Sequence, residues 1–273
     1  MNAAARNTFL SLCLVLCLPF YGNTQNLSLH IKRASNTIKI DGILNESAWK
    51  QSTTVDEFWQ YFPSDSVKAK LETEIYMTYD DEYLYVAAKC YAKHEDYIIP
   101  SLRRDYRTEG NDNISFLFDT FDDQTNAFLF GMNPYGVRRE ALISNGGGRK
   151  SDFSESWDNQ WYGESKIHEG YWVCELAIPF KTIRFKKGSK KWRFNSYRFD
   201  TQMNERSTWN KIPRNQWIFN LAFMGDMYWD EPLEKTSCNV TVIPYATSSY
   251  LQDYEEVNAD FEFDYDFGAD LKI

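Results

Sequence analysis

The chain is poor in the residues from which most catalytic and metal sites are built. Its 273 residues include only three histidines, His30, His94 and His168, and these lie far apart in the sequence. No glycine-rich phosphate loop of the G-x-x-x-x-G-K type occurs. The 30 lysines and arginines are outnumbered by 39 aspartates and glutamates, which gives a net charge of −9, and they form no basic block. Nucleic acid is therefore not an expected partner, because its affinity comes largely from neutralised phosphates.

Cysteine is sparse as well. Of the five cysteines, Cys13 and Cys17 lie in an apolar N-terminal segment, and three remain in the rest of the chain: Cys90, Cys174 and Cys238. A small, odd number does not indicate a disulfide framework. Cys90 and Cys174 each alternate in phase with apolar residues, so we predict two separate buried thiols on strands. A single Cys90–Cys174 bridge is the alternative.

The N-terminal segment has the features of an export signal. Residues 9–20 form an apolar run of twelve behind Arg6, and a polar stretch follows at residues 21–25. This run has the length of a signal-peptide core and is too short for a membrane span of about 20 residues. We predict that residues 1–25 are a signal peptide and that the protein reaches the periplasm, the outer membrane or the cell surface. A buried N-terminal helix, cut short by Pro19, is the alternative.

Aromatic side chains, in contrast, are abundant at 17% of the chain, and many lie in segments with strand-like alternation. One short helix is predicted at residues 46–49, with Asn45 as its cap. Many short strands separated by turns predict an all-β fold, an antiparallel β-sandwich over residues 26–224. The expected strands are residues 71–79, 82–91, 113–119, 127–133, 137–144, 161–168, 170–178, 191–200, 207–212 and 216–223.

The pattern changes after residue 224. Acidic residues and Pro232 interrupt the alternation at residues 225–237, which we predict to be a linker. Residues 238–251 could form one long strand, and residues 260–267 alternate aromatic with acidic side chains. Such alternation is typical of outer-membrane strands, which meet lipid on one side and a wet lumen on the other. We therefore predict that residues 238–273 begin a barrel-like outer-membrane region. An amphipathic hairpin at the sandwich edge is the alternative.

Several segments resemble known families. Residues 38–49, 78–86 and 111–119 are similar to signatures of family 9 carbohydrate-binding modules. Residues 130–137 and 177–185 resemble a family of exported Gram-negative proteins, which join such a module to a C-terminal barrel-like region of unknown function. Residues 242–245 and 267–272 resemble the start of that barrel-like region. The resemblance implies a sandwich of jelly-roll type and a non-catalytic glycan-binding role in polysaccharide use at the cell envelope.

The resemblance also implies where a sugar would bind. Family members that bind sugars clamp a terminal sugar between aromatic rings, and polar side chains fix its hydroxyls. In this sequence, Glu109 lies near the position where such family members have one of the two clamping tryptophans. Gly131 lies near the position of an arginine that often contacts the sugar. Trp209 is a possible counterpart of the second clamping tryptophan. Half of the family's site is thus expected to be missing. This favours, as an alternative, a structural or partner-docking domain that has lost sugar binding; a glycoside hydrolase is a more distant one.

The tryptophans provide the remaining site candidates. We predict Trp49, Trp172 and Trp217 to be structural, from their positions on the expected helix and strands. Residues 157–162 place two indoles beside hydrogen-bonding side chains, as glycan contact requires. For each of the other tryptophans the alternative is a rim aromatic that covers the edge of the sandwich. The predicted ligand-binding residues are Trp157, Trp161, Trp209, Trp59, Asn159 and Gln160.

The positions of the carboxylates in the sequence do not indicate a catalytic site. Asp119, Asp122 and Asp123 could offer oxygens to Ca²⁺, although they lack the spacing of a dedicated calcium loop. A glycosidase needs two carboxylates across a cleft, and no spacing in this sequence singles out such a pair. We therefore expect no catalytic residue and no cofactor, with calcium as the open alternative.

Overall fold

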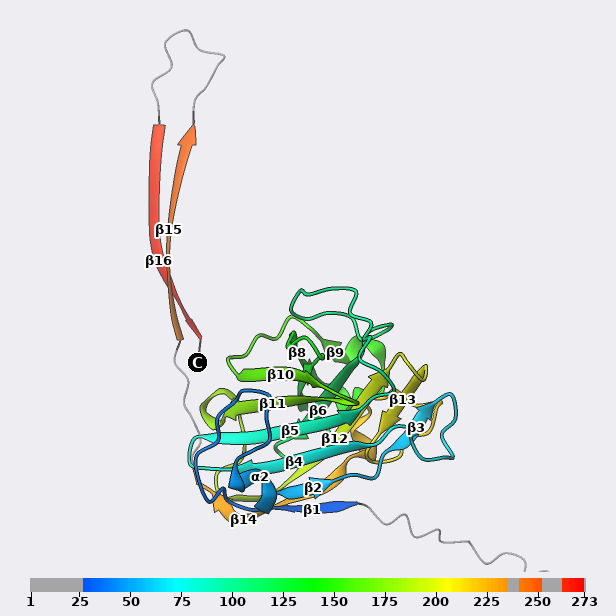
Figure 1. Cartoon of the computed structure of the whole chain (residues 1–273). Helices are drawn as coiled ribbons and strands as arrows, with labels where there is room; N and C mark the ends of the chain where they lie inside the picture. Colours follow the sequence, from blue (N-terminus) through cyan, green and yellow to red (C-terminus); the bar gives the residue numbers. More distant parts are fainter. Residues whose placement is uncertain (1–26, 235–240, 252–261, 273) are drawn as a thin grey trace, which may run out of the picture.

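The computed structural model describes residues 27–234, 241–251 and 262–272. The predicted signal peptide and Cys238 lie outside these residues. Two β-sheets pack face to face as a sandwich, and a two-stranded hairpin follows (Figure 1). The all-β prediction and the antiparallel sandwich are confirmed.

The larger sheet contains nine strands. Its pairs are antiparallel except for β1 and β14, which run parallel. The order is β1 (Ser28–Ile31), β14 (Gly225–Leu233), β12 (Ser189–Asp200), β6 (Asn113–Asp119), β7 (Ala127–Met132), β8 (Arg138–Ile143) and β9 (Phe153–Ser154), while β13 (Glu205–Thr208) pairs with β12 and with β3 (Trp59–Phe62).

The smaller sheet contains five antiparallel strands. Their order is β10 (Tyr162–His168), β11 (Tyr171–Pro179), β5 (Tyr83–Tyr91), β4 (Thr73–Tyr79) and β2 (Thr53–Val55). Short 3₁₀ helices lie in the connections: η1 (Asn145–Gly147), η2 (Lys150–Asp152), η3 (Phe180–Thr182) and η4 (Leu221–Phe223).

The core lies between the sheets and is rich in rings. Phe116, Phe118 and Phe130 of the larger sheet are fully buried against the smaller one. Trp192 and Trp229 meet edge to face with ring centroids 4.9 Å apart, a favourable geometry for aromatic pairs. The outer faces are covered too. Phe219, Leu221 and Met224 cover the larger sheet, and residues of the segment that contains helix α2 (Ser47–Gln51) cover the smaller one.

Cys90 and Cys174 are buried and free, so the prediction of two separate thiols is confirmed. Trp172 is buried as predicted. Trp49 lies on helix α2 (Ser47–Gln51) and is also buried, which confirms its structural role, but Glu46 rather than Asn45 is the cap residue. Within the described part of the chain, no helix has the length and apolar character needed to cross a membrane.

Two predicted strands and the predicted linker need correction. Of residues 207–212, only Ser207 and Thr208 lie in a strand, because β13 ends at Thr208. Residues 216–223 form a turn and η4 rather than a strand, so the alternation argument does not hold for Trp217, which is 43% exposed. Residues Gly225–Leu233, predicted as a linker, form β14 inside the larger sheet. Of the acidic residues that suggested a linker, Asp226 lies on the outer face of this strand and pairs with Lys191, while Trp229 points into the core.

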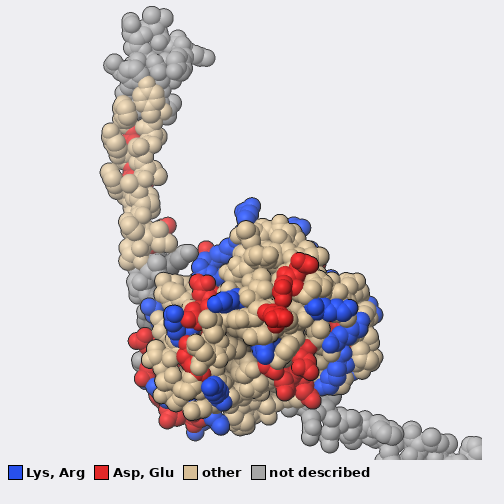
Figure 2. Space-filling view, in the orientation of Figure 1, with Lys and Arg blue, Asp and Glu red and all other residues tan. Residues whose placement is uncertain are grey.

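The C-terminal segment forms a hairpin of β15 (Thr241–Leu251) and β16 (Glu262–Lys272), which pair antiparallel. Its aromatic rings are exposed, with Phe263, Tyr265 and Phe267 between 60% and 75% accessible. β15 contains no charged residue, while Asp264 and Asp266 of β16 alternate with these rings. Acidic and basic side chains are interspersed on the visible face of the sandwich (Figure 2). The described residues contain no closed barrel, so the predicted barrel-like region stays a prediction.

Candidate functional site

A row of side chains crosses the outer face of the larger sheet. Thr208 of β13, Tyr197 of β12, Ser115 of β6, Gly131 of β7 and Arg139 of β8 are neighbours in register. Side chains opposite one another on paired strands share one face of a sheet. The row therefore brings together residues from five strands that the sequence separates by up to 93 positions (208 − 115).

Gly131 leaves room for Arg139 to lie across the sheet. A Cβ at Gly131 would approach Ser115 Oγ to 2.7 Å and Arg139 Cγ to 2.9 Å, closer than real Cβ contacts. The side chain of Arg139 passes over this position, and its Nη1 donates to the hydroxyl of Tyr197 at 3.1 Å. The guanidinium of Arg139, from the neighbouring strand β8, thus occupies the space beside Gly131.

The guanidinium of Arg139 is buried, at 3% exposure, with little charge compensation. Its Cζ lies 5.3 Å from the ring centroid of Phe153 and 5.9 Å from that of Tyr106, so ring faces form much of its surroundings. The nearest carboxylate oxygen, of the half-exposed Glu155, is 3.9 Å from Nη2. A buried cation held in this way is costly unless another group compensates it.

Several buried polar atoms beside Arg139 have no hydrogen-bond partner in the described residues. They are Arg139 Nε, Ser115 Oγ, Thr208 Oγ1 and the hydroxyl of Tyr106. Buried polar atoms are normally paired, by protein, by water or by a ligand. We call Arg139, Ser115, Tyr197, Thr208 and Tyr106 the Arg139 cluster; its free donors and acceptors suit the hydroxyls of a sugar.

Tyr106 covers the cluster from the connection between β5 and β6. The neighbouring Asp105 anchors this loop, because its carboxylate accepts the N–H of Glu140 at 3.0 Å and its own N–H donates to Arg138 O at 3.1 Å. Burial raises the pKa of Tyr106, so its phenol stays protonated. Glu109, in the expected place of a clamp tryptophan, is exposed, and the ring over Arg139 comes from Tyr106 instead.

A series of rings leads from Arg139 to the surface. Phe153 lies 5.1 Å from Phe219, which stacks on the exposed Trp217 at 5.7 Å. Sequence reasoning missed both Arg139 and Trp217. The available signal was a glycine on one strand with a long cationic side chain on the next, but only the strand register shows that the two are neighbours.

The six predicted ligand residues fall into two groups. Trp161 is 1% exposed and its Nε1 donates to Glu140 Oε2 at 3.0 Å, while Trp157 packs on Phe128 at 5.0 Å. The backbone N–H of Asn159 also donates to Glu140, and the side chain of Gln160 is exposed. Glu140, which sequence reasoning did not single out, thus organises this segment.

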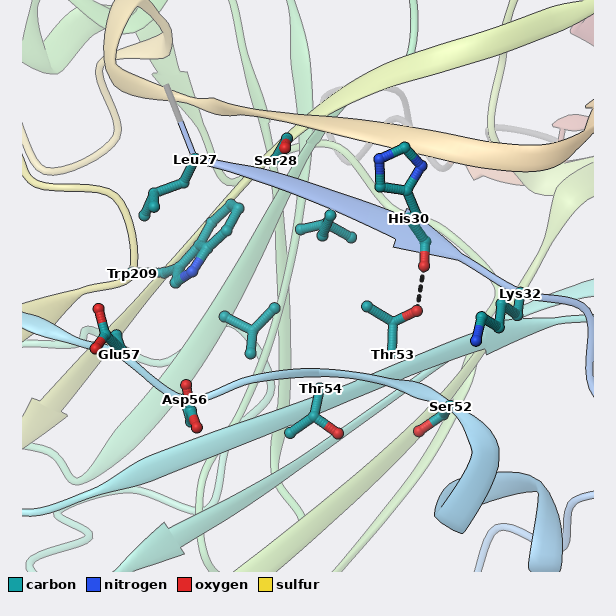
Figure 3. A pocket seen from close by; sticks show the side chains of 12 residues that line it. Leu27, Ser28, His30, Lys32, Ser52, Thr53, Thr54, Asp56, Glu57 and Trp209 are labelled. Atoms are coloured by element: carbon teal, nitrogen blue, oxygen red, sulfur yellow. Dashed lines mark hydrogen bonds between the residues drawn. The ribbon is translucent and has the colours of Figure 1, made fainter. Parts of the chain in front are cut away.

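Trp59 and Trp209 lie apart from these residues, at the paired strands β3 and β13. Lys68 Nζ lies 4.1 Å and Lys211 Nζ 5.1 Å from the ring centroid of Trp59. Trp209 is 5% exposed and lies at one end of a hollow of about 440 Å³ between β1 and β2 (Figure 3). The opposite end of this hollow holds Thr53, whose hydroxyl donates to the carbonyl of His30. Since Trp209 is its only indole and is nearly buried, this hollow offers no pair of open ring faces.

The acidic turn after β6 uses its carboxylate internally. Asp119 accepts the backbone N–H groups of Phe121, Asp123 and Gln124 at 2.8 to 3.4 Å, and burial raises its pKa. In the described residues, no group of three or more histidine, cysteine, aspartate or glutamate side chains is arranged to hold a metal ion.

Comparisons with known proteins agree with this architecture. One solved structure with the same fold is a "putative carbohydrate-binding protein" from Bacteroides uniformis, at 13% identity and a TM-score of 0.59, covering 75% of this chain and 100% of that chain. A family 9 carbohydrate binding module from Caldicellulosiruptor kristjanssonii in complex with cellotriose matches at 13% identity and a TM-score of 0.52, covering 78% of this chain and 96% of that one. A family 9 module from the same organism in complex with glucose matches at 14% identity and a TM-score of 0.50, covering 77% of this chain and 98% of that one.

These identities show the fold alone, and no curated protein matches the chain. A family model described as carbohydrate family 9 binding domain-like matches residues 40–229, well over half of the sequence. The chain therefore belongs to the family of carbohydrate family 9 binding domain-like proteins.

Proposed function

We propose that this protein is an exported, non-catalytic glycan-binding module of the cell envelope and that the Arg139 cluster contacts the sugar. Its family is one of carbohydrate-binding modules rather than catalytic domains. The observation that carries the proposal is the set of unpartnered buried donors and acceptors beside Arg139, flanked by aromatic rings. Stacked rings with a few fixed polar groups are the usual means of binding a sugar.

The proposal requires Tyr106 to move, since it covers Arg139. Its loop carries no strand between β5 and β6, so rotating the ring of Tyr106 away breaks no sheet pairing and leaves the hydrogen bonds of Asp105 to β8 in place. A sugar that replaced the Tyr106 ring would offer hydroxyls to Arg139 Nε and Ser115 Oγ, which lack partners. The gain from pairing buried polar groups would offset the cost of moving the ring.

Titration calorimetry of the full chain against a panel of mono- and polysaccharides, with and without calcium, tests this function. We expect saturable binding with a negative heat-capacity change. Arg139→Lys should weaken it at least tenfold, because lysine lacks the planar fork of donors. The exposed Arg103→Lys is the matched control. Unchanged affinity in Arg139→Lys would remove the cluster from the site.

A structural or partner-docking role is the second candidate. The observation in its favour is that Tyr106 and Phe153 enclose Arg139 with the protein's own rings. If this role is correct, a folded sample binds no sugar in the panel, and the Arg139→Lys variant differs only in stability.

We also propose that residues 238–273 link the module to the outer membrane. The exposed aromatic residues Phe263, Tyr265 and Phe267 of β16 support this link, because ring faces of this kind suit a lipid boundary. Fractionation of cells that express the full chain, compared with a chain ending at residue 237, tests it. Loss of the shorter chain from the outer-membrane fraction is the expected result, and equal retention would contradict it.

A further inference from the structure

A second hollow lies at the smaller sheet, along edge strand β10. It has a volume of about 670 Å³, within the range of about 300–1,000 Å³ that ligand sites occupy. Its walls come from both sheets, and Ile38 and Ile40 of the N-terminal segment close one side. We call it the tyrosine groove; among its lining residues are Tyr83, Tyr85, Tyr135, Arg138, Tyr162 and Ser165.

The register of the sheet explains why the groove is hollow. Tyr162 of β10 is opposite Ala177 of β11, which is opposite Tyr85 of β5. A small side chain therefore lies between two large ones on the same face, about 10 Å apart at a strand spacing of about 4.8 Å. Tyr83 completes the floor, with its ring centroid 5.8 Å from that of Tyr85 and 6.3 Å from that of Tyr162.

The opposite wall is a rigid turn that presents an exposed ring. Tyr135 is 57% exposed, and Asn133 Oδ1 accepts the N–H groups of Tyr135 and Val137, each at 3.0 Å. Gly136 has φ +75°, a conformation that glycine adopts without strain, and lies beside the backbone of Ser165. The ring of Tyr135 is thus displayed on a preorganised support.

The polar groups of the groove are fixed and balanced in charge. Arg138 Nη1 donates to Trp161 O at 2.6 Å, and its guanidinium lies 5.5 Å from the ring centroid of Trp161. The carboxylate of the exposed Glu164 lines the same hollow, so opposite charges face the groove. Ser165, opposite the core residue Cys174, turns its buried hydroxyl to the other face of β10 from Tyr162 and Glu164.

We propose that the tyrosine groove is a second carbohydrate-binding surface, which holds an extended, neutral oligosaccharide. This inference rests on the proposed function. The exposed rings of Tyr135 and Tyr162 stack on pyranose faces, while their phenol hydroxyls pair with sugar hydroxyls. Because Arg138 and Glu164 balance each other, the groove does not select a charged chain. Gln160, one of the predicted ligand residues, lies at its end, with Nε2 3.5 Å from Tyr162 OH.

Calorimetry of the full chain with neutral gluco-, xylo- and manno-oligosaccharides of one to six units tests the groove. The double substitution Tyr135→Ala, Tyr162→Ala should weaken binding of the longer chains at least tenfold and leave monosaccharide binding unchanged. Both side chains are exposed, so the variant should unfold at the same urea concentration as the wild type. Tyr245→Ala, with a ring as exposed as Tyr162 at 45%, is the matched control.

The two proposals fail in different ways. Wild-type affinity for long chains in the double variant, with binding that still depends on Arg139, overturns the groove and leaves the proposed function intact. Failure of the wild-type protein to bind any sugar overturns both. A third outcome is that the double substitution abolishes binding of a peptide and leaves sugar binding unchanged. In that case edge strand β10 binds peptides by strand addition, and the carbohydrate assignment of the groove is overturned.

Discussion

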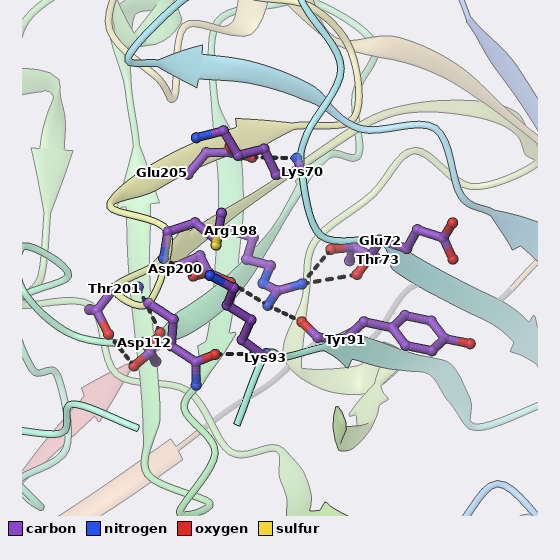
Figure 4. A network of polar contacts seen from close by, with 12 residues as sticks. Lys70, Glu72, Thr73, Tyr91, Lys93, Asp112, Arg198, Asp200, Thr201 and Glu205 are labelled. Carbon is purple, nitrogen blue, oxygen red and sulfur yellow. Dashed lines mark hydrogen bonds and ion pairs between the residues drawn. The ribbon is translucent and has the colours of Figure 1, made fainter. Parts of the chain in front are cut away.

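Arg198 and Arg139 lie on opposite faces of the larger sheet, and each is 3% exposed. Around Arg198 the guanidinium reaches four acceptors: Asp200 Oδ2 and Tyr91 O at 2.6 Å, and Glu72 O and Thr73 Oγ1 at 3.0 Å (Figure 4). The guanidinium of Arg139 donates to one hydroxyl, that of Tyr197, at 3.1 Å. Two equally buried arginines thus differ in their hydrogen bonding: Arg198 donates to four acceptors, and Arg139 donates to one.

This difference separates a structural cation from one that suits a ligand. Arg198 joins the larger sheet to β4 and β5 of the smaller one, and Asp200 balances its charge. Arg139 joins no second sheet, and ring faces surround it. Burial alone does not distinguish these roles; the number of satisfied hydrogen-bond donors does.

The largest expected effect comes from replacing each arginine by methionine. Arg198→Met should lower the free energy of unfolding by about 3–5 kcal/mol, because it leaves Asp200 buried without its partner. Arg139→Met should change it by less than about 1 kcal/mol, since replacing an uncompensated buried charge by an apolar side chain is often neutral. Urea unfolding of both variants at one pH measures the difference. Equal losses would mean that Arg139 is structural too.

A smaller effect is expected from the glycine beneath Arg139. Gly131→Ala should destabilise the fold by about 2 kcal/mol, because the added Cβ overlaps Ser115 Oγ and the stem of Arg139. It should also abolish Arg139-dependent sugar binding by displacing the guanidinium. Gly148→Ala is the control, since nothing lies within 4 Å of the added atom. A fully stable, binding-competent Gly131→Ala protein would contradict this account of the cluster.

The smallest effect concerns a buried anion, Glu175 of the smaller sheet. Its carboxylate accepts N–H groups of Asp41, Gly42 and Trp49 at 2.6 to 2.9 Å, yet burial raises its pKa from an ordinary value near 4.5 to about 6. Between these two values the folded state holds a proton that the unfolded state releases. Stability should therefore fall as pH rises from about 4.5 to about 6, by at most about 2 kcal/mol.

Unfolding free energies measured from pH 4 to 7 test this dependence. Glu175→Gln should reduce the slope, because the amide does not titrate, and should leave the part that comes from other buried carboxylates with raised pKa values, such as Asp119. Glu164→Gln is the control, since Glu164 lies opposite Glu175 on β10 but is exposed. The same pH slope in wild type and Glu175→Gln would assign the titration to another group.

Much of the fold could be predicted because the strands are amphipathic. The predicted segment 113–119 matches β6, and 82–91 matches β5 within one residue, since turn residues mark their ends. Prediction failed at β14, where Asp226, Asp230 and Glu231 concealed the alternation of the buried Met227 and Trp229. It also failed at residues 216–223, whose apolar side chains cover the larger sheet without pairing to it.

The site was less predictable than the fold. Residues 157–162 were predicted as a ligand platform because they combine indoles with polar side chains, but the hydrogen bond to Glu140 holds Trp161 inside the fold. The Arg139 cluster and the tyrosine groove each draw side chains from several strands. No local pattern reports which side chains will meet, because that depends on strand order and register.

The sequence by itself determined the all-β class, most of the strands, the buried thiols and the resemblance to carbohydrate-binding modules, since each follows from local alternation or a contiguous motif. Tertiary structure alone decided that Arg139 lies over Gly131, that Arg198 is saturated and that Ala177 leaves a hollow between two tyrosines. These features depend on contacts between strands distant in sequence, and only the register of the folded sheets brings them together.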